Sequence, residues 1–423
     1  MPIMKLKLTK NEIFTVTFLV VTVISIIELF HGVNPNFYFH QDTIDSFMDL
    51  FNSVIEHYHS KSEFRFGIYP PLAEIPYKLF SLLVPSDIPF SIGTREQAFA
   101  LRSTLAGNVM LMLHIVPFFV VFVILLMYSI DGSFFRKVFY TILIASSGIV
   151  FWALERGNII IYAFLFAFLF FVLYKNENRY IRWLSYICLA ISVGLKLYPA
   201  VFAIVLLRDK RYKAIFFFIA CVLIVYILLL LSGKGSLSSI VKSFENMLRW
   251  SNKHEEGMGL NCSVKNFFLL INIFFRKCLR GAISIQYTNQ VFYVIQILTL
   301  FFGIFSFFFS EEKWKKVFSL TVLCIYIPSV SYMYTLIFLI VPLVFFINEK
   351  KQSGIFDFFY AMIFAIVIVF FIIPVKTNAE VYFVTGNFAL QQTVLMLMFL
   401  MVVGQAIIRC CCKFSKNRLN STL

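Results

Sequence analysis

Three aspartates near the start of the chain have the residue type and the spacing for acid–base chemistry. Asp42, Asp45 and Asp49 lie at positions i, i+3 and i+7, so a helix would place them on one face. A partly buried carboxylate on such a face can accept a proton from a hydroxyl group as a general base. The alternative is a solvated helix face on which Asp42 or Asp45 caps the N-terminus. The spacing supports the two interpretations about equally.

These aspartates belong to a polar stretch, residues 40–71, in an otherwise apolar chain. Of the 423 residues, 60% are hydrophobic and only 14% are charged, and the mean hydropathy is +0.85. This composition is typical of a polytopic membrane protein. We expect an all-α polytopic fold, with about 12 transmembrane helices and interfacial helices in the first outer loop. The basic residues lie in short clusters between apolar runs, which favours cytoplasmic loops over nucleic-acid binding.

The basic clusters also predict the orientation of the chain. Three lysines precede the first span, residues 13–31, and place the N-terminus in the cytoplasm. The same rule puts two loops, residues 32–103 and 233–288, outside a cell membrane, and it returns the C-terminus to the cytoplasm. Residues 71–84 are too short to cross the membrane, so we expect them to form a helix at its surface. Residues 1–423 are therefore predicted to be one multi-pass membrane domain.

A helix break is predicted within the apolar run 183–207, which lies between two strongly basic loops. A single crossing would put one basic loop outside, whereas two short helices that meet at residues 196–199 leave both inside. Pro199 breaks a helix, and unwound backbone at that depth requires a cavity lined by water or protein. Lys196 would then face an outer cavity, with snorkelling to the surface as the alternative.

A second pair of charges occurs where an apolar span ends. Glu155 and Arg156 are costly at that depth unless they pair or line a cavity, and a simple interfacial ion pair is the alternative explanation. Basic residues on the outer face run against the positive-inside tendency. Their expected role is to bind an anionic group such as a phosphate.

Neither the cysteines nor the histidines have the spacing of metal ligands. Six of the eight cysteines lie within apolar segments or beside basic residues after the last span, and no span carries His-x-x-x-His. We therefore predict no metal site and no cofactor. The aspartate cluster is compatible with a divalent cation, but the interpretation does not require one.

Several short motifs occur in the order found in one family of membrane enzymes. They are Tyr69-Pro70-Pro71-Leu72, Glu155-Arg156-Gly157-Asn158, Lys196-Leu197-Tyr198-Pro199, Gly259 to Val264, and Pro328 to Tyr332. No single motif is specific, but the ordered set resembles glycosyltransferase family 87 of the GT-C superfamily, whose members use polyprenyl-phosphate sugars. The chain departs from the family pattern in having three competing aspartates, and in having Tyr332 and Tyr334 where some relatives have a polar or histidine-containing turn.

The resemblance implies an inverting, extracytoplasmic glycosyltransferase. A mannose-like sugar would pass from a polyprenyl-phosphate donor in the bilayer to a lipid-linked or cell-envelope glycan. The candidate bases are Asp49, Asp42 and Asp45, of which Asp49 lies in the sequence most similar to the family pattern. The donor phosphate would be bound by Lys196, Arg156, Arg249 and Lys265. The substrate pocket would include Tyr69, Glu155, Asn158, Tyr198, Asn261, Ser263 and Tyr332.

Two other classes of protein fit parts of the sequence. A Wzy-type polysaccharide polymerase or an O-antigen ligase is also polytopic, but such enzymes typically depend on arginine and histidine loops instead of a first-loop carboxylate. A transporter of lipid-linked glycans fits the helices broken by glycine and proline, but the chain has no inverted hydropathy repeat. An enzyme transfers sugar in detergent, whereas a transporter needs a sealed vesicle.

Overall fold

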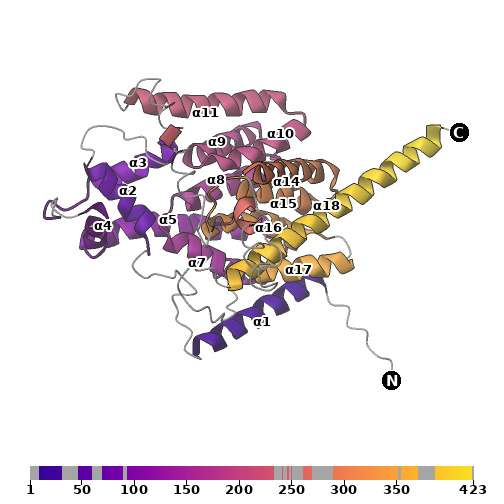
Figure 1. Ribbon diagram of the computed structural model, residues 1–423, viewed down its shortest axis with the longest axis horizontal. Helices are drawn as coiled ribbons and strands as arrows, with labels where there is room; N and C mark the ends of the chain where they lie inside the picture. Colours follow the sequence, from indigo (N-terminus) through magenta and orange to yellow (C-terminus); the bar gives the residue numbers. More distant parts are fainter. Residues whose placement is uncertain are drawn as a thin grey trace.

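A computed structural model shows a helical bundle (Figure 1). It describes residues 9–30, 46–59, 69–88, 93–232, 241, 245–246, 249, 261–268, 289–350, 354–369 and 386–421. Among these residues there is no β-strand, and one isolated antiparallel bridge joins Asn261 to Tyr332. The predicted all-α class is confirmed.

The first part of the chain forms helices before and within the predicted first loop and then a series of apolar helices. Their bounds are α1 (Lys10–Phe30), α2 (Met48–His59), α3 (Pro71–Ser81), α4 (Thr94–Arg102), α5 (Leu105–Ser129), α6 (Phe134–Ala145), α7 (Gly148–Glu155), α8 (Ile160–Leu173), α9 (Arg179–Leu195), the 3-10 helix η3 (Tyr198–Ala203), α10 (Ile204–Arg208) and α11 (Tyr212–Ser232). The later elements are α14 (Asn289–Phe309), α15 (Lys313–Tyr326), the 3-10 helix η4 (Met333–Leu339), α16 (Ile340–Asn348), α17 (Ile355–Ile368) and α18 (Gly386–Ser421).

Within the residues that the structure describes, four helices are long and apolar enough to cross a membrane, or five if α6 and α7, which meet at an angle of 51°, form one bent span. The four contain Lys10–Ile27, Leu105–Ser129, Gln290–Phe309 and Leu390–Lys413. The chain is therefore a membrane protein. The count of about 12 spans stays a prediction, because it also requires shorter apolar helices to cross.

Local sequence explains where several helices begin and end. The side chains of Thr104, Ser133 and Asn178 accept hydrogen bonds from backbone N–H groups in the first turns of α5, α6 and α9. The helix break predicted at residues 196–199 is observed, because α9 ends at Leu195 and η3 begins at Tyr198. Lys196 between them has an extended backbone.

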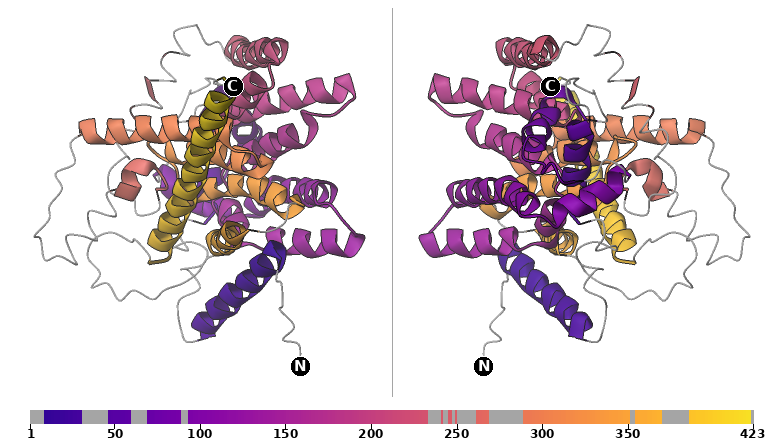
Figure 2. Two further views of the ribbon diagram at one scale, coloured as in Figure 1. Left: turned by 90° about the vertical axis from the view of Figure 1, so that its right-hand side faces the viewer. Right: turned by 90° about the vertical axis from the view of Figure 1, so that its left-hand side faces the viewer.

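The bundle has two distinct ends. Figure 1 shows α1 beginning and α18 ending on the side away from α2, α3 and α4, and the right-hand view of Figure 2 shows these short helices in front of the bundle. At the end where α1 begins and α18 ends, Asn348 donates to the carbonyl of Ser129 at 2.7 Å, and Arg136 donates to the carbonyl of Ile347 at 2.9 Å. The Nζ of Lys10 lies 4.8 Å from the ring centre of Phe346 at the same end.

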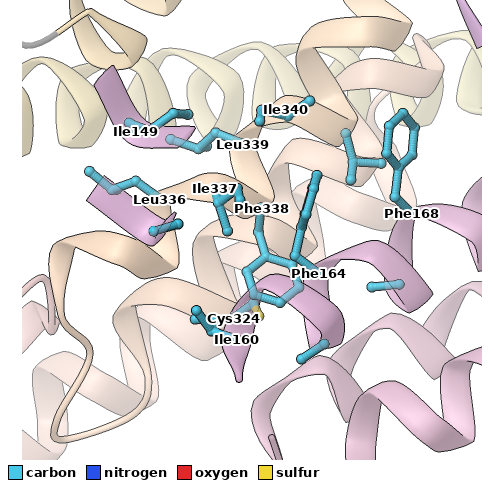
Figure 3. Close-up of a cluster of buried hydrophobic side chains, with 14 of the residues drawn as sticks. Ile149, Ile160, Phe164, Phe168, Cys324, Leu336, Ile337, Phe338, Leu339 and Ile340 are labelled. Atoms are coloured by element: carbon cyan, nitrogen blue, oxygen red, sulfur yellow. The ribbon is translucent and has the colours of Figure 1, made fainter. Parts of the chain in front are cut away.

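A core of buried side chains fixes η4 against α7, α8 and α15 (Figure 3). Phe164 and Phe338 are fully buried, and their rings meet edge to face with centroids 5.8 Å apart. Between membrane helices the stabilisation comes from close van der Waals packing, because lipid tails are as apolar as the side chains. This packing holds the α7–α8 turn and the start of η4 in fixed positions.

Candidate active site

The α7–α8 turn and the start of α2 are joined by their backbones. The amide of Phe47 donates to the carbonyl of Glu155 at 2.6 Å, and the amide of Asp49 donates to the carbonyl of Arg156 at 3.3 Å. The hydroxyl of Ser46 also donates to Oε1 of Glu155 at 2.7 Å. Segments more than 100 residues apart are therefore held together at the point where Asp49 enters α2.

Gly157 is required at the centre of this junction. Its φ angle of +63° lies in the left-handed region, which L-residues with a side chain rarely adopt. A Cβ atom added there would lie 3.0 Å from Cβ of Leu50 and 3.2 Å from the carbonyl oxygen of Phe47. Glycine therefore permits both the turn and the close approach of α2.

Asp49 is bound by two side chains from that turn. Arg156 forms an ion pair with Oδ1 of Asp49, and Nδ2 of Asn158 donates to Oδ2 at 2.7 Å. The side chains of Arg156 and Asp49 are 16% and 15% exposed, so the pair is shielded but reachable. Each carboxylate oxygen has two lone pairs, so these bonds fix the carboxylate without using its full accepting capacity.

Asn158 and its neighbour Ile159 connect the site of Asp49 to two tyrosines, Tyr69 and Tyr77. Nδ2 of Asn158 also donates to the hydroxyl of Tyr69 at 3.2 Å, and its Oδ1 accepts from the amide of Ile160, the first residue of α8, at 3.0 Å. The hydroxyl of Tyr77 accepts from the amide of Ile159 at 3.3 Å. Burial first, and then the charge of Asp49, raise the pKa of Tyr69 well above its ordinary value, so this phenol stays protonated.

Lys196 brings a second cation to the same place. Its Nζ lies 4.2 Å from the ring centre of Tyr69, and the residue is only 9% exposed. The negative charges of Asp49 and Glu74 are close enough to act on this ammonium group. Within the described part of the chain, no acidic side chain forms an ion pair with it.

Asn261 and Ser263 belong to a separate polar junction. Oδ1 of Asn261 accepts from the amides of Ser263 and Ser331 at 3.0 and 2.9 Å, and its Nδ2 donates to the carbonyl of Ser329 at 2.9 Å. The hydroxyl of Ser263 accepts from the amide of Asn266 at 3.2 Å. These side chains bond backbone groups and so hold residues 261–268 against the turn that precedes η4.

Tyr332 and Tyr334 link this junction to Asp49. Tyr332 pairs with Asn261 in the bridge, and its ring centroid lies 5.5 Å from that of Tyr334. Tyr334 belongs to η4, which packs against α7, and the charges of Asp49 and Arg156 act on its hydroxyl. Since η4 packs against α7, the polar junction lies beside the helix that ends at the turn bound to Asp49.

The remaining predicted residues lie elsewhere. Arg249 is exposed and forms an ion pair of 3.7 Å with Glu245, so the structure does not bring it to Asp49. Lys265 is buried, with its Nζ 5.2 Å from the ring centre of Phe292. Tyr198 packs its ring against Phe338 at 6.0 Å. Asp42 and Asp45, like most of the second loop at 233–288, lie outside the described residues.

The structure also adds residues that the sequence interpretation left out. Tyr77 and Glu74, three residues apart on α3, both face the interior, as does His57 on α2. Nε2 of His57 lies 2.8 Å from Oε2 of Glu74. The sequence does contain a signal for this face of α3. A charged residue and a tyrosine three positions apart in a short apolar helix lie on the same face.

The apolar helices and the shielded polar region around Asp49 define a polytopic membrane protein with a charged internal site. The family model of glycosyltransferase family 87 matches residues 68–309, which is more than half of the chain, and the chain belongs to that family. The resemblance seen in the sequence is confirmed. No curated protein and no solved structure matches the chain. The matched segment contains Arg156, Asn158 and Lys196, whereas Asp49 lies outside it, 19 residues before its first residue, 68.

Proposed function

We propose that this glycosyltransferase transfers a mannose-like sugar from a polyprenyl-phosphate donor to a glycan or glycolipid acceptor, with inversion at the anomeric carbon. The observation that carries the proposal is the meeting of one carboxylate, Asp49, with two cations, Arg156 and Lys196, in a shielded site. A carboxylate can take a proton and cations can bind a phosphate, which are the two tasks of this reaction.

Asp49 is the proposed general base. It takes the proton of an acceptor hydroxyl as that oxygen attacks the anomeric carbon, and the bond from this carbon to the phosphate oxygen breaks. Polyprenyl phosphate leaves with the electron pair. The hydrogen bond of 2.7 Å from Asn158 and the ion pair with Arg156 support this role, because they orient the carboxylate before substrate binds.

Lys196 and Arg156 are proposed to stabilise the leaving phosphate. Negative charge grows on that phosphate in the transition state, and fixed positive groups in a site of low water content stabilise it strongly. Lys196 is the better candidate for direct contact, because it is buried beside Tyr69 at a helix break. With two cations available, we propose that the reaction needs no metal or other cofactor. Treatment of the purified enzyme with a chelator tests whether it needs a metal.

The donor lipid is proposed to reach the site along α3. Leu79, Leu82 and Leu83 at the end of this helix are 60%, 78% and 46% exposed. Exposed leucines on a short helix next to the site suit the surface of a bilayer and its acyl or polyprenyl chains. The other face of α3 contributes Tyr77 to the region around Asp49.

We further propose that this site faces outward and that both termini are cytoplasmic in a cell membrane. Support comes from the basic residues at the opposite end of the bundle, where α1 begins and α18 ends (Figure 1). Lys and Arg are enriched in cytoplasmic loops. Cysteine accessibility on each side of sealed cells tests the orientation independently of activity.

The reaction is tested with purified protein in detergent and an acceptor glycolipid. Labelled polyprenyl-phosphate mannose, labelled nucleotide mannose and a polyprenyl-pyrophosphate glycan are supplied separately. Transfer from polyprenyl-phosphate mannose alone is expected. Transfer only from the pyrophosphate glycan would instead identify a polymerase or ligase, and the absence of any product in detergent, with movement of the lipid across sealed vesicles, would identify a transporter.

A further inference from the structure

A cavity of about 290 Å³ lies at the end of the bundle away from Asp49. Its lining residues are Arg208, Phe308, Phe309, Ser310, Glu311, Lys316, Arg409 and Lys413. They come from α10, from the end of α14 with the turn and the start of α15 that follow it, and from α18, so the folded chain brings together three distant segments. A second cavity of about 530 Å³ shares part of this lining.

The position of the cavity follows from α15. Lys316 in its first turn lines the cavity, whereas Tyr326 at its last turn donates to the carbonyl of Gln392 at 3.4 Å. The side chain of Gln392 in turn contacts Cys262 at 3.2 Å, next to Asn261. A helix of 14 residues is about 21 Å long. The cavity is therefore separate from the candidate active site.

Positive charge exceeds negative charge in this cavity. Glu311 is the one acidic residue among the described residues that line it. Glu311 pairs with Arg409 at 2.9 Å, and its carbonyl accepts from Nζ of Lys316 at 2.7 Å. Among the described residues, neither Arg208 nor Lys413 forms an ion pair with an acidic side chain. Burial first, and then the charges of Arg208 and its cationic neighbours, lower the pKa of Lys316 to about 8. Like charges held this close favour an anion that neutralises them.

Exposed apolar side chains lie close to the cavity. Ile407 and Ile408 directly precede Arg409 on α18 and are 40% and 65% exposed. Phe308 on α14 is 43% exposed. Both helices contain candidate membrane spans. A cationic cavity that borders such a surface has the composition of a site for a lipid that carries a negative head group.

We propose that this cavity binds the phosphate of an anionic phospholipid, with Arg208 and Lys413 as its main contacts and Phe308 beside the acyl chains. A planar guanidinium can hold two phosphate oxygens at once, and an ammonium adds a point charge. A bound lipid would join α10, α14, α15 and α18 at this end and so stabilise the bundle. The proposal does not depend on the reaction at Asp49.

The test measures binding of phosphatidylglycerol with a fluorescent acyl chain to the full chain in zwitterionic micelles. Saturable binding is expected, with phosphatidylcholine carrying the same fluorophore as the reference. Each cation near an anionic lipid contributes roughly fivefold to affinity. Arg208→Gln with Lys413→Gln should therefore weaken binding about 25-fold, since it removes two such cations.

The matched control is Arg179→Gln with Lys350→Gln, which removes the same charge from exposed positions. It should bind as the unmodified chain does, and Arg208→Lys with Lys413→Arg should keep most of the affinity. Equal losses in the two charge-removing variants, or no preference for phosphatidylglycerol in the unmodified chain, would overturn the proposal. Competition by inorganic phosphate at low concentration would support the phosphate site but assign it to a soluble anion, against the lipid.

Discussion

Replacement of Gly157 by alanine should damage both the stability and the activity of the enzyme. An alanine at φ +63° costs about 1–2 kcal/mol in backbone strain. Its Cβ would lie 3.0 Å from Cβ of Leu50, and overpacking of this kind costs about 1–3 kcal/mol. The sum, about 2–5 kcal/mol, lowers the unfolding midpoint by roughly 2–5 °C for a chain of this length.

The effect on transfer should be larger than the effect on stability. The turn that contains Gly157 carries Arg156 and Asn158 to Asp49, and a displacement near 1 Å in such a site costs roughly 100-fold in rate. The assays are thermal unfolding in detergent and sugar transfer. Gly404→Ala is the control, because nothing lies within 4 Å of the added Cβ atom on α18. If both alanine variants unfold and react alike, the role assigned to the turn is wrong.

Three further predictions concern the polar residues around this turn. Asn158→Ala should cost about 1 kcal/mol through the lost hydrogen bond with the amide of Ile160 and should also reduce transfer at least tenfold, because Asp49 loses its 2.7 Å hydrogen bond. Lys196→Met should lower kcat/KM for the polyprenyl-phosphate donor by roughly 100-fold, measured at saturating acceptor. His57→Gln should destabilise the protein below pH 6.5 and much less at high pH, as followed by the unfolding midpoint at each pH.

Matched substitutions separate local from general effects. Asn178→Ala removes a similar hydrogen bond, in which the side chain accepts from the amide of Tyr180 two residues on at 2.9 Å, so it should lose stability and keep transfer. Lys175→Met removes an exposed lysine at the other end of the bundle and should leave donor use unchanged. Equal loss of transfer in Asn158→Ala and Asn178→Ala, or in the two lysine variants, contradicts the roles proposed for the site.

The sign of the pH effect follows from the partners of His57. Burial acts to lower its pKa, but the hydrogen bond and charge of Glu74 and the carbonyl of Ser53 raise it above the ordinary value. Both ring nitrogens face oxygen acceptors at 2.8 Å, so the doubly protonated ring satisfies both. The stabilisation that protonated His57 contributes to the fold is complete below the pKa of histidine in the unfolded chain, about 6.5. This stabilisation declines as the pH rises through the pKa of His57 in the folded protein. If the unfolding midpoints of the unmodified protein and His57→Gln differ by the same amount at every pH, this explanation of the role of His57 is wrong.

Much of the fold and part of the site could be predicted because they depend on short-range signals. Apolar composition identified a helical membrane protein, and Pro199 between two basic loops marked the end of α9. The Glu155 to Asn158 motif identified the turn that binds Asp49. The sequence did not reveal that Asn261 bonds the backbone at Ser329 and Ser331, since that contact joins segments about 70 residues apart.

Other features depended on long-range packing. Arg249 was expected near the phosphate because basic residues on a predicted outer loop suggest an anion site, yet it is exposed beside Glu245. Tyr77 and Tyr334 reach the region of Asp49 only because α3 and η4 pack there. No local pattern fixes which helix lies against which, so such residues emerge from the structure alone.

The most direct test of the proposed function is the initial rate of sugar transfer from polyprenyl-phosphate mannose by variants that fold with unchanged melting behaviour. Asp49→Asn keeps the shape of the side chain but cannot take the proton, so the rate should fall about 100- to 10,000-fold. Asp87→Asn, at an exposed position in the same predicted loop, should react at the unmodified rate. Asp42→Asn and Asp45→Asn should retain transfer. Full activity in Asp49→Asn would contradict the assignment of this carboxylate as the base.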